Sequence, residues 1–349
     1  MGKSKVLMIG PDRSVHGGIS GVVNNYYEAG IEEQIELMYL GTMVEGSKLR
    51  KLIRAIVAYI KFCRLLPGYS IVHVNMASDS SYYRKSFFIR KAKKAHKRII
   101  IHQHGGDFET FYRKQKSDAK RAKIKEVLNM ADVFLVLSPI LETFFKKLII
   151  PSKIVLFPNA IAVGAPFEKE YGKQRMLFLG RICKEKGIGE LFQILPELHE
   201  KYPKMKLFLG GVWEDEELQK QAEKLSEYVI YLGWVGEENK RQYLALSDIF
   251  VFPTYFEGQP VSVLEAMASY CAVAASDTGG IPQMVQHEKS GLLFEPKDAD
   301  ALKNTLECLL EDVQLCRYLG MNARKIVEEK FVMKDSLKRL VEIYHENEC

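Results

Sequence analysis

The 349-residue sequence lacks the patterns that mark disulfide-rich, metal-binding and membrane-spanning proteins. Its six cysteines are scattered, and none forms a C-x-x-C pair or joins a Cys/His cluster at metal-ligand spacing. This usage fits a reducing compartment, so no disulfide scaffold is expected. No apolar run reaches the roughly 18 residues that span a bilayer, and the N-terminus lacks the apolar region of a signal peptide. We therefore expect a cytoplasmic protein.

The chain does have a globular composition and a strongly uneven charge. With 47% hydrophobic and 27% charged residues, it is expected to form two soluble domains of ordinary size. The net charge of +6 conceals 21 Lys or Arg against 6 Asp or Glu between Glu45 and Met130, which leaves −9 for the remainder. An acidic lipid surface, a phosphorylated acceptor or nucleic acid would fit this basic region. The alternative is a solvated basic face without a partner.

Short apolar segments alternate with helical patterns along the whole chain, which indicates β-α-β units and parallel sheets. In the first half, strands are expected at 5–10, 71–75, 98–103, 132–138 and 153–157. After a linker that begins at Pro158, they are expected at 175–179, 205–209, 229–232, 248–252, 272–275 and 291–294. We predict an α/β protein of two doubly wound, Rossmann-like domains facing across a cleft. The N-terminal domain would span residues 1–160 and the second 161–330, and a helix at 331–349 would pack back on the N-terminal domain.

The segment 48–66 carries apolar residues at helical spacing, among them Leu52, Ile56 and Ile60, while Lys and Arg lie mostly elsewhere. This pattern predicts an amphipathic helix. One interpretation is a basic helix that touches a membrane. The other, which we favour, is an ordinary helix packed on a sheet.

A glycine-rich loop, Gly17-Gly18-Ile-Ser-Gly21, follows the first predicted strand and runs into a helical pattern. It does not have the G-x-G-x-x-G spacing, and no acidic residue ends a second clear strand about 20 positions later. The dinucleotide fingerprint is therefore weak. A loop that needs close backbone approach to a ligand is the better interpretation.

The strongest pattern in the chain is the stretch from Tyr255 to Ala268, which holds two carboxylates, Glu257 and Glu265. A buried strand precedes it, and Pro260 suits the first position of a helix, so we expect the helix to begin there or at Val261. A strand, a loop and a helix N-terminus in that order place free backbone N–H groups at the rim of a sheet, where an anion binds. The N–H groups near Val261 and Ser262 would contribute to this anion site.

Two cations, Arg181 and Lys186, lie just after the first strand of the second domain. Together they can supply positive charge to a diphosphate without a metal ion, because Arg matches phosphate geometry and Lys adds a point charge. The alternative is a pair of surface cations beside a strand.

Several motifs at once resemble a known family. Gly180-Arg181-x₄-Lys186-Gly187, Glu257-x₇-Glu265, Gly279-Gly280-Ile-Pro282 and Ser290-Gly291-Leu-Leu resemble the C-terminal half of retaining glycosyltransferases of family 4, which have the GT-B fold. Gly17-Gly18, His104-Gly105 and Pro158-Asn159 match the N-terminal half in order and spacing. Loops such as Ser81–Lys85 and His102–Phe108 are similar to those of bacterial capsule or exopolysaccharide transferases.

The resemblance implies a role for each matching residue. Glu265 would bind the ribose hydroxyls of a nucleotide, and Glu257 would act at the donor sugar. His104, on the N-terminal side, would be the second catalytic residue, although a structural histidine is the alternative. The full donor-binding set would be Gly17, Gly18, Arg181, Lys186, Gly258, Gln259, Pro260, Val261, Ser262 and Glu265. The acceptor side would be Asp107, Arg84 and Lys85. Neither a cofactor nor a metal is expected.

The leading hypothesis is a hexosyltransferase that moves a sugar from a nucleotide sugar, with UDP expected, to a glycan or polyprenyl-diphosphate-linked acceptor in bacterial surface polysaccharide synthesis. Peripheral association with the inner membrane face would go through the basic N-terminal half. One alternative is a sugar phosphorylase or nucleotide-sugar epimerase on the same fold, which would need a phosphate site or an extra acid–base pair. Another is a membrane- or nucleic-acid-binding module, for which no nucleic-acid motif is present.

Overall fold

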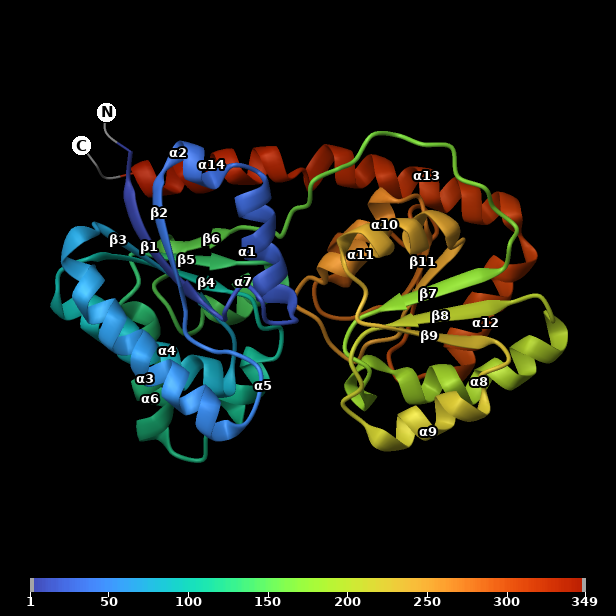
Figure 1. Ribbon diagram of the computed structural model, residues 1–349, viewed down its shortest axis with the longest axis horizontal. Coiled ribbons are helices and arrows are strands. Elements are labelled where there is room, and N and C mark those ends of the chain that lie inside the picture. The colour runs from blue at the N-terminus through green and yellow to red at the C-terminus, as the bar shows by residue number, and fades with distance from the viewer. Residues whose placement is uncertain (1–2, 347–349) are drawn as a thin grey trace. The chain divides into compact units, whose positions relative to one another are not determined.

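A computed structural model describes residues 3–346 and divides the chain into two compact units (Figure 1). Unit 1 consists of two segments, the chain up to Ala162 and the chain from Met333 onward. Unit 2 is Val163–Val332. Each unit contains one six-stranded parallel sheet with helices on both faces. The predicted class, two parallel-sheet Rossmann-like domains, is confirmed. The predicted borders after residues 160 and 330 lie two residues from those of the units.

The sheet of unit 1 has the strand order β2-β1-β3-β4-β5-β6. The strands are β1 (Lys5–Gly10), β2 (Glu36–Gly41), β3 (Ile71–Met76), β4 (Arg98–Gln103), β5 (Val133–Val136) and β6 (Ile154–Leu156). Strand β3 pairs with β1 and β4 and is buried at every position. This double burial explains why the central strands are continuous apolar runs in the sequence.

The sequence did not predict β2. Its residues Glu-Leu-Met-Tyr-Leu-Gly lie at the edge of the sheet, and four of the six are exposed or half-buried. An edge strand paired on one side needs no uninterrupted apolar run. Its sequence is therefore less distinctive than that of its neighbour β1.

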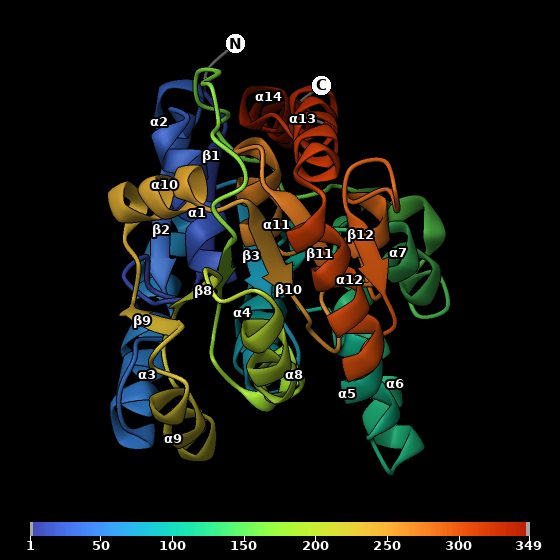
Figure 2. The same cartoon turned by 90° about the vertical axis from the view of Figure 1, so that its right-hand side faces the viewer.

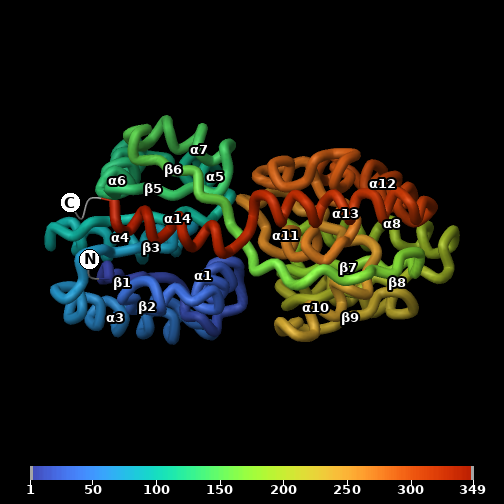
Figure 3. The backbone as a smooth tube through the Cα atoms, turned by 90° about the horizontal axis from the view of Figure 1, so that it is seen from above, coloured from blue at the N-terminus to red at the C-terminus, as the bar shows by residue number. Residues whose placement is uncertain are grey.

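The helices of unit 1 form two layers. They are α1 (Gly18–Glu28), α2 (Ile31–Gln34), α3 (Lys48–Leu65), α4 (Asp79–Lys94), α5 (Phe108–Arg113), α6 (Asp118–Asn129), α7 (Pro139–Phe145) and α14 (Met333–His345). Helices α3, α4 and α6 lie on one face of the sheet, while α1 and α14 lie on the other (Figure 1). Helix α14 runs beside α1 (Figure 3), and its Tyr344 hydroxyl lies 2.6 Å from Nδ1 of His73 on β3. The C-terminal segment thus packs on unit 1, while residues 347–349 of the predicted helix lie outside the described residues.

The favoured interpretation of the 48–66 segment, an ordinary helix packed on a sheet, is confirmed only in part. The helix forms, but only Ala58 and Phe62 of α3 are buried. Its longer apolar stripe is exposed, with 57% exposure at Leu52 and 53% at Ile56. The physical reason is that α3 contacts the sheet and α4 through the Ala58 and Phe62 side, so the stripe has no core to enter.

The sheet of unit 2 has the order β12-β11-β10-β7-β8-β9. Its strands are β7 (Arg175–Leu179), β8 (Lys206–Gly210), β9 (Val229–Gly233), β10 (Ile249–Phe252), β11 (Ala272–Ser276) and β12 (Leu292–Phe294). Its helices are α8 (Ile188–Lys201), α9 (Glu216–Lys224), α10 (Glu237–Leu246), α11 (Val261–Ala268), α12 (Ala299–Glu311) and α13 (Val313–Lys330). Helices α10, α11 and α13 cover one face, and α8, α9 and α12 cover the other (Figures 1 and 2).

Candidate functional site

The order of strands in unit 2 reverses between β7 and β10. Strand β7 comes first in this unit, yet β8 lies on one side of it and β10 on the other. Ligands of open parallel sheets bind at such a switch point, outside the carboxyl ends of the strands. The segments that leave β7 and β10 there carry Lys186 and Glu257, respectively.

Lys186 and Glu257 form an ion pair at this position. Lys186 ends the short 3-10 turn Lys184–Lys186, and its ammonium donates to Oε1 of Glu257. The two side chains are only 12% and 23% exposed, so water screens the pair weakly. The ammonium also lies 5.6 Å from the ring centroid of Phe252. The structure therefore brings together two residues that stand 71 positions apart in the sequence.

Backbone contacts hold the two loops in place. The amide of Tyr255 donates to Glu185 O at 2.9 Å, and the Tyr255 hydroxyl donates to Glu190 Oε1 at 2.7 Å. Gly187 has φ +67°, and a Cβ atom there would collide with the carbonyl oxygen of Pro253. Only glycine tolerates both this conformation and this approach. The glycine after Lys186 is thus explained by the fit between the two loops.

The Gly279-Gly280 motif supports Glu257 from the other side. The amide of Gly280 donates to Glu257 O at 3.0 Å. Gly279 has φ +59°, and a Cβ atom there would collide with the same carbonyl oxygen. The motif therefore positions the backbone of Glu257.

Helix α11 begins at Val261 with Pro260 as its N-cap, in agreement with the predicted start. No side chain caps this end. The first amides of a helix have no intrahelical acceptor, so the N–H groups of Val261 and Ser262 can meet an anion. Gly258 and Gln259 lie in the loop between Glu257 and this helix, and Gln259 is 6% exposed.

Glu265, one turn into α11, is held by a lysine that the sequence did not single out. Lys240 Nζ on α10 lies 2.6 Å from Glu265 Oε1 and 2.6 Å from Glu237 Oε1. Burial lowers the pKa of Lys240, but the carboxylates of Glu265 and Glu237 outweigh it and raise that pKa above its ordinary value. Lys240 is therefore charged at neutral pH and forms a charge-assisted contact with Glu265.

Arg181 follows Gly180 at the carboxyl end of β7 and is more exposed than Lys186. Its guanidinium pairs with Glu214 Oε2 at 2.9 Å, with the two side chains 57% and 43% exposed. Such an exposed pair is weak and can exchange its carboxylate for a phosphate. Trp213, the residue before Glu214, packs on Tyr231 with ring centroids 5.1 Å apart.

The carboxyl edge of the unit 1 sheet holds the remaining predicted residues, and its character differs. Gly17 and Gly18 are exposed at the start of α1, and a Cβ atom on either would meet no other atom within 4 Å. The backbone at Gly17 is extended, with φ 170°. No neighbouring part of the protein therefore packs so close to Gly17 or Gly18 that glycine is required. The role of these glycines in the close approach of a ligand stays a prediction.

His104 follows β4 and is half-buried. Its Nε2–H donates to Asn75 Oδ1 at 2.8 Å, which leaves Nδ1 as an acceptor. The ring packs against that of His102, with centroids 4.0 Å apart and the ring planes tilted by 34°. Burial, followed by nearby His73 and Lys85, lowers the pKa of His104 to about 3. His104 is therefore a neutral hydrogen-bonding group at pH 7.

The three predicted acceptor-side residues are not equivalent. Asp107 is exposed, and its Oδ1 accepts from the Ser78 hydroxyl at 2.8 Å. Arg84 is half-buried on α4. The prediction that Lys85 contacts an acceptor is wrong, because its side chain is completely buried and its ammonium donates to Asn75 O at the end of β3. Burial, with Arg84 next, holds the pKa of Lys85 well below its ordinary value.

Within residues 3–346, no group of three or more His, Cys, Asp or Glu side chains has the arrangement of a metal site. Over the same range, no helix has the length and apolar character needed to cross a membrane.

Residues 165–326 match the model of the family described as Glycosyl transferases group 1. The match covers nearly all of unit 2, including the Lys186–Glu257 pair and helix α11. The prediction of a glycosyltransferase domain is therefore confirmed for this part of the chain.

Relatives in the curated proteins resemble the same region. A phosphatidyl-myo-inositol mannosyltransferase from Mycolicibacterium smegmatis is 31% identical over 173 residues, which cover 47% of this chain and 45% of the relative. An O-antigen chain mannosyltransferase B from Escherichia coli is 32% identical over 145 residues, 39% of this chain and 37% of the relative. The chain spans about half the length of the first curated relatives it matches.

Solved structures share the fold over nearly the whole chain. Sucrose-phosphate synthase from Thermosynechococcus elongatus superposes with a TM-score of 0.81 at 20% identity and covers 99% of both chains. Anabaena HepE, in complex with UDP and glucose, gives 0.76 at 16% identity and covers 97% of this chain and 99% of its own. These neighbours are glycosyltransferases of the GT-B fold, so the predicted fold class is confirmed.

Sequence reasoning missed Lys240, Glu214, Trp213 and Tyr231 in the glycosyltransferase domain. Lys240 lies in a helix of ordinary composition, and its pairing with Glu265 depends on how α10 and α11 pack on one face of the sheet. The signal for Trp213 is that tryptophan occurs only twice in the chain and that this one lies two positions after the Gly210-Gly211 pair at the end of β8.

Proposed function

We propose that this chain is a retaining hexosyltransferase of the family 4 type. It would transfer a sugar from a nucleotide sugar, with UDP as the expected nucleotide, to a glycan or polyprenyl-diphosphate-linked acceptor in bacterial surface polysaccharide synthesis. The observation that carries the proposal is the Lys186–Glu257 pair beside the free N-terminus of α11, at the switch point of the unit 2 sheet. Retention of configuration rests on the resemblance of the sequence motifs.

The diphosphate of the donor would bind at the end of α11. Lys186 and Arg181 supply positive charge, and the amides of Val261 and Ser262 supply hydrogen bonds. These groups are fixed before the reaction and strengthen their contacts as charge develops on the departing diphosphate. Two cations and a helix N-terminus give the leaving group a charge balance that needs no metal ion, and we propose a metal-independent reaction on that basis.

Glu257 would act at the sugar. Before the donor binds, its carboxylate neutralises Lys186. A phosphate that binds Lys186 would share its ammonium with Glu257. The Glu257 carboxylate would then be less neutralised and would present more negative charge on the side away from Lys186. A carboxylate at that position stabilises the positive charge of an oxocarbenium-like centre. The proposed role of Glu257 is thus electrostatic.

Glu265 would accept hydrogen bonds from the ribose hydroxyls. Lys240 pairs with Glu265 and fixes its carboxylate, and hydrogen bonds to a charged partner are stronger than those between neutral groups. On unit 1, the neutral imidazole of His104 remains a proposed catalytic group, and Asp107 remains a proposed acceptor-side group.

The acceptor class has weaker support than the donor class. The Escherichia coli relative is named as an O-antigen chain mannosyltransferase, and the Mycolicibacterium relative as a phosphatidyl-myo-inositol mannosyltransferase. Both names describe the transfer of a sugar to a surface glycan or a lipid. The basic region between Glu45 and Met130, with 21 Lys or Arg, would favour a phosphate-bearing acceptor and peripheral attachment to the inner membrane face.

Thermal unfolding in the presence of nucleoside diphosphates tests the donor site. With EDTA present, UDP at about 100 times its Kd should raise Tm by roughly 5–10 °C. Lys186→Ala should remove the shift. Lys184→Ala is the matched control, because Lys184 lies two residues earlier with a 68% exposed side chain and should keep it. If UDP, GDP and ADP all leave Tm unchanged, or if Lys186→Ala keeps the full shift, the proposal fails.

A further inference from the structure

Helix α3 presents an apolar surface that no described part of the chain covers. Between Leu49 and Ile60, the side chains of Leu49, Leu52, Ile53, Ile56, Val57 and Ile60 are 48–66% exposed. On the neighbouring helix α4, Phe87 is 64% exposed. The eleven helical steps from Leu49 to Ile60 correspond to a stripe about 17 Å long. An apolar surface of this extent, outside the core, marks an interaction site.

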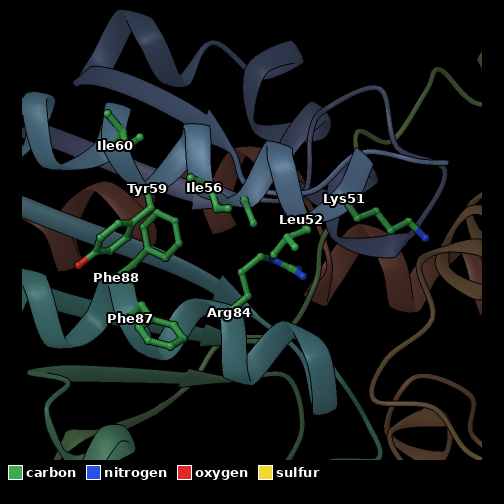
Figure 4. A pocket seen from close by; sticks show the side chains of 9 residues that line it. Lys51, Leu52, Ile56, Tyr59, Ile60, Arg84, Phe87 and Phe88 are labelled. Carbon is green, nitrogen blue, oxygen red and sulfur yellow. The ribbon is translucent and has the colours of Figure 1, made fainter. Parts of the chain in front are cut away.

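A pocket of about 420 Å³ lies between the two helices. Its lining is mostly apolar and consists of Leu52, Ala55, Ile56, Tyr59, Ile60, Phe87 and Phe88, with Lys51 and Arg84. Figure 4 shows Lys51 and Arg84 toward one end, and Tyr59, Ile60 and Phe88 toward the other. The pocket is therefore amphipathic along its length.

The two cations at the polar end form no ion pair with an acidic side chain among residues 3–346. No hydrogen bond or ion pair joins the Arg84 guanidinium or the Lys51 ammonium to any residue within 3–346. Arg84 Nε is buried without an acceptor. A guanidinium beside an apolar pocket is most stable when an anion with two oxygens, such as a phosphate, pairs with it.

The charge around the stripe narrows the choice of occupant. Helix α3 has six Lys or Arg and no Asp or Glu. A second copy of the chain on this face would bring two sets of like charges together. Nucleic acid would match the charge but not a row of exposed aliphatic side chains. A bilayer with anionic headgroups matches both, because apolar side chains enter the acyl region while Lys and Arg stay at the phosphates.

We propose that the α3–α4 face docks on an anionic phospholipid bilayer. In this arrangement one acyl chain enters the pocket along Ile56, Tyr59 and Ile60, and its phosphate pairs with Arg84 and Lys51. Only the biological role of this docking rests on the proposed function, since docking would bring a lipid-linked acceptor to the enzyme. Binding itself can be measured without catalysis.

Co-sedimentation of the full chain with vesicles tests the proposal. The chain should bind vesicles of phosphatidylcholine and phosphatidylglycerol at 7:3 and bind pure phosphatidylcholine at least tenfold more weakly, because several cations contribute. Leu52→Gln with Ile56→Gln should lower binding to the anionic vesicles more than tenfold. Met321→Gln with Tyr318→Gln is the matched control, since both residues are more than half exposed on α13, and it should bind as wild type.

Two further variants test the pocket itself. Ala55→Phe adds apolar area but fills the pocket, so it should weaken vesicle binding if a chain enters there. Arg84→Gln with Lys51→Gln should reduce the preference for anionic over neutral vesicles roughly tenfold. Equal or stronger binding by Ala55→Phe, with an unchanged Tm, would refute occupation of the pocket.

The failure of this proposal and that of the proposed function are separable. Absence of vesicle binding at low salt, with an intact UDP shift in Tm, would overturn the docking surface alone. Vesicle binding without any nucleotide effect would overturn the proposed donor site alone. Sedimentation velocity without lipid should show a monomer, and a dimer that Leu52→Gln with Ile56→Gln dissociates would assign the face to a second copy instead.

Discussion

The carboxyl edges of the two sheets come from the same architecture but carry opposite chemistry. In unit 2, the polar side chains are ionised and paired, Lys186 with Glu257 and Lys240 with Glu265. In unit 1, His104 at the corresponding edge and His73 inside β3 are neutral at pH 7, since burial lowers the pKa values of both to about 3. The unit 2 edge thus presents paired charges that an anion can engage, whereas His104 of unit 1 offers an uncharged hydrogen-bonding group.

The difference follows from how each edge is enclosed. Helix α14 returns to unit 1 and places Tyr344 against His73, which closes the face on which His73 and His102 lie. In unit 2, the ion pairs beside α11 remain 12–23% exposed. Partial exposure lets a charged pair exist without full desolvation and lets a ligand replace one partner.

The largest effect should come from breaking the Lys186–Glu257 pair. Lys186→Met and Glu257→Gln should each lower kcat/KM by about 10²–10³-fold, the range for loss of one preorganised electrostatic group. Because each single variant leaves the other side chain without its partner, the double variant should lose less than the product of the two. Steady-state transfer kinetics measure this, with Lys184→Met as the control. Purely multiplicative losses would mean that the pair does not act as a unit.

The next largest difference should be in the stability cost of replacing a glycine at each of the two sheet edges. Gly279→Ala places a Cβ atom against Glu257 O at positive φ, so it should destabilise unit 2 by roughly 2–4 kcal/mol. Gly17→Ala meets open space and should change stability by less than about 0.5 kcal/mol. Both tryptophans, Trp213 and Trp234, lie in unit 2, so urea unfolding followed by their fluorescence measures the Gly279 variant, and far-UV circular dichroism, which also reports unit 1, measures the Gly17 variant. Equal midpoints for the two variants would contradict the proposed contact.

Acid should lower the stability of unit 1 more than that of unit 2. His73 is fully buried, and its pKa falls from an ordinary value near 6.5 to about 3. The unfolded chain therefore binds more protons than the folded chain below pH 6.5, and stability is lost as pH falls from 6.5 toward 3. The loss for His73 is up to about 1.4 kcal/mol per pH unit.

Unit-specific readouts check the acid prediction. Between pH 7.5 and 5, the urea midpoint followed by far-UV circular dichroism should fall further than the midpoint followed by tryptophan fluorescence, which reports unit 2 alone. His73→Gln cannot titrate and should flatten the dependence in unit 1. An unchanged slope in that variant would show that other groups control acid unfolding.

Much of the fold could be predicted from sequence because buried parallel strands are continuous apolar runs. The start of α11 followed from Pro260, and Lys186 and Glu257 were both expected in the donor site, but the ion pair between them was not predicted. Lys85 could not be placed, because a helix in a basic region gives no sign of which lysine turns inward. The exposure of α3 was equally hidden, since an amphipathic pattern is the same whether its apolar side meets a core or remains uncovered.

The smallest effect should come from Lys240, which acts on the nucleotide only through Glu265. Lys240 is proposed to fix the Glu265 carboxylate, which accepts hydrogen bonds from the ribose. Lys240→Gln should therefore weaken UDP binding about threefold to tenfold, as expected when one charge-assisted hydrogen bond is weakened indirectly. The loss should be smaller for 2′-deoxy-UDP, which lacks one of the hydroxyls. Titration calorimetry with both nucleotides measures the difference, and Lys240→Arg should restore part of it because a cation returns beside Glu265. If Lys240→Gln weakens both nucleotides equally, Lys240 acts through the general charge of the site and not through the orientation of Glu265.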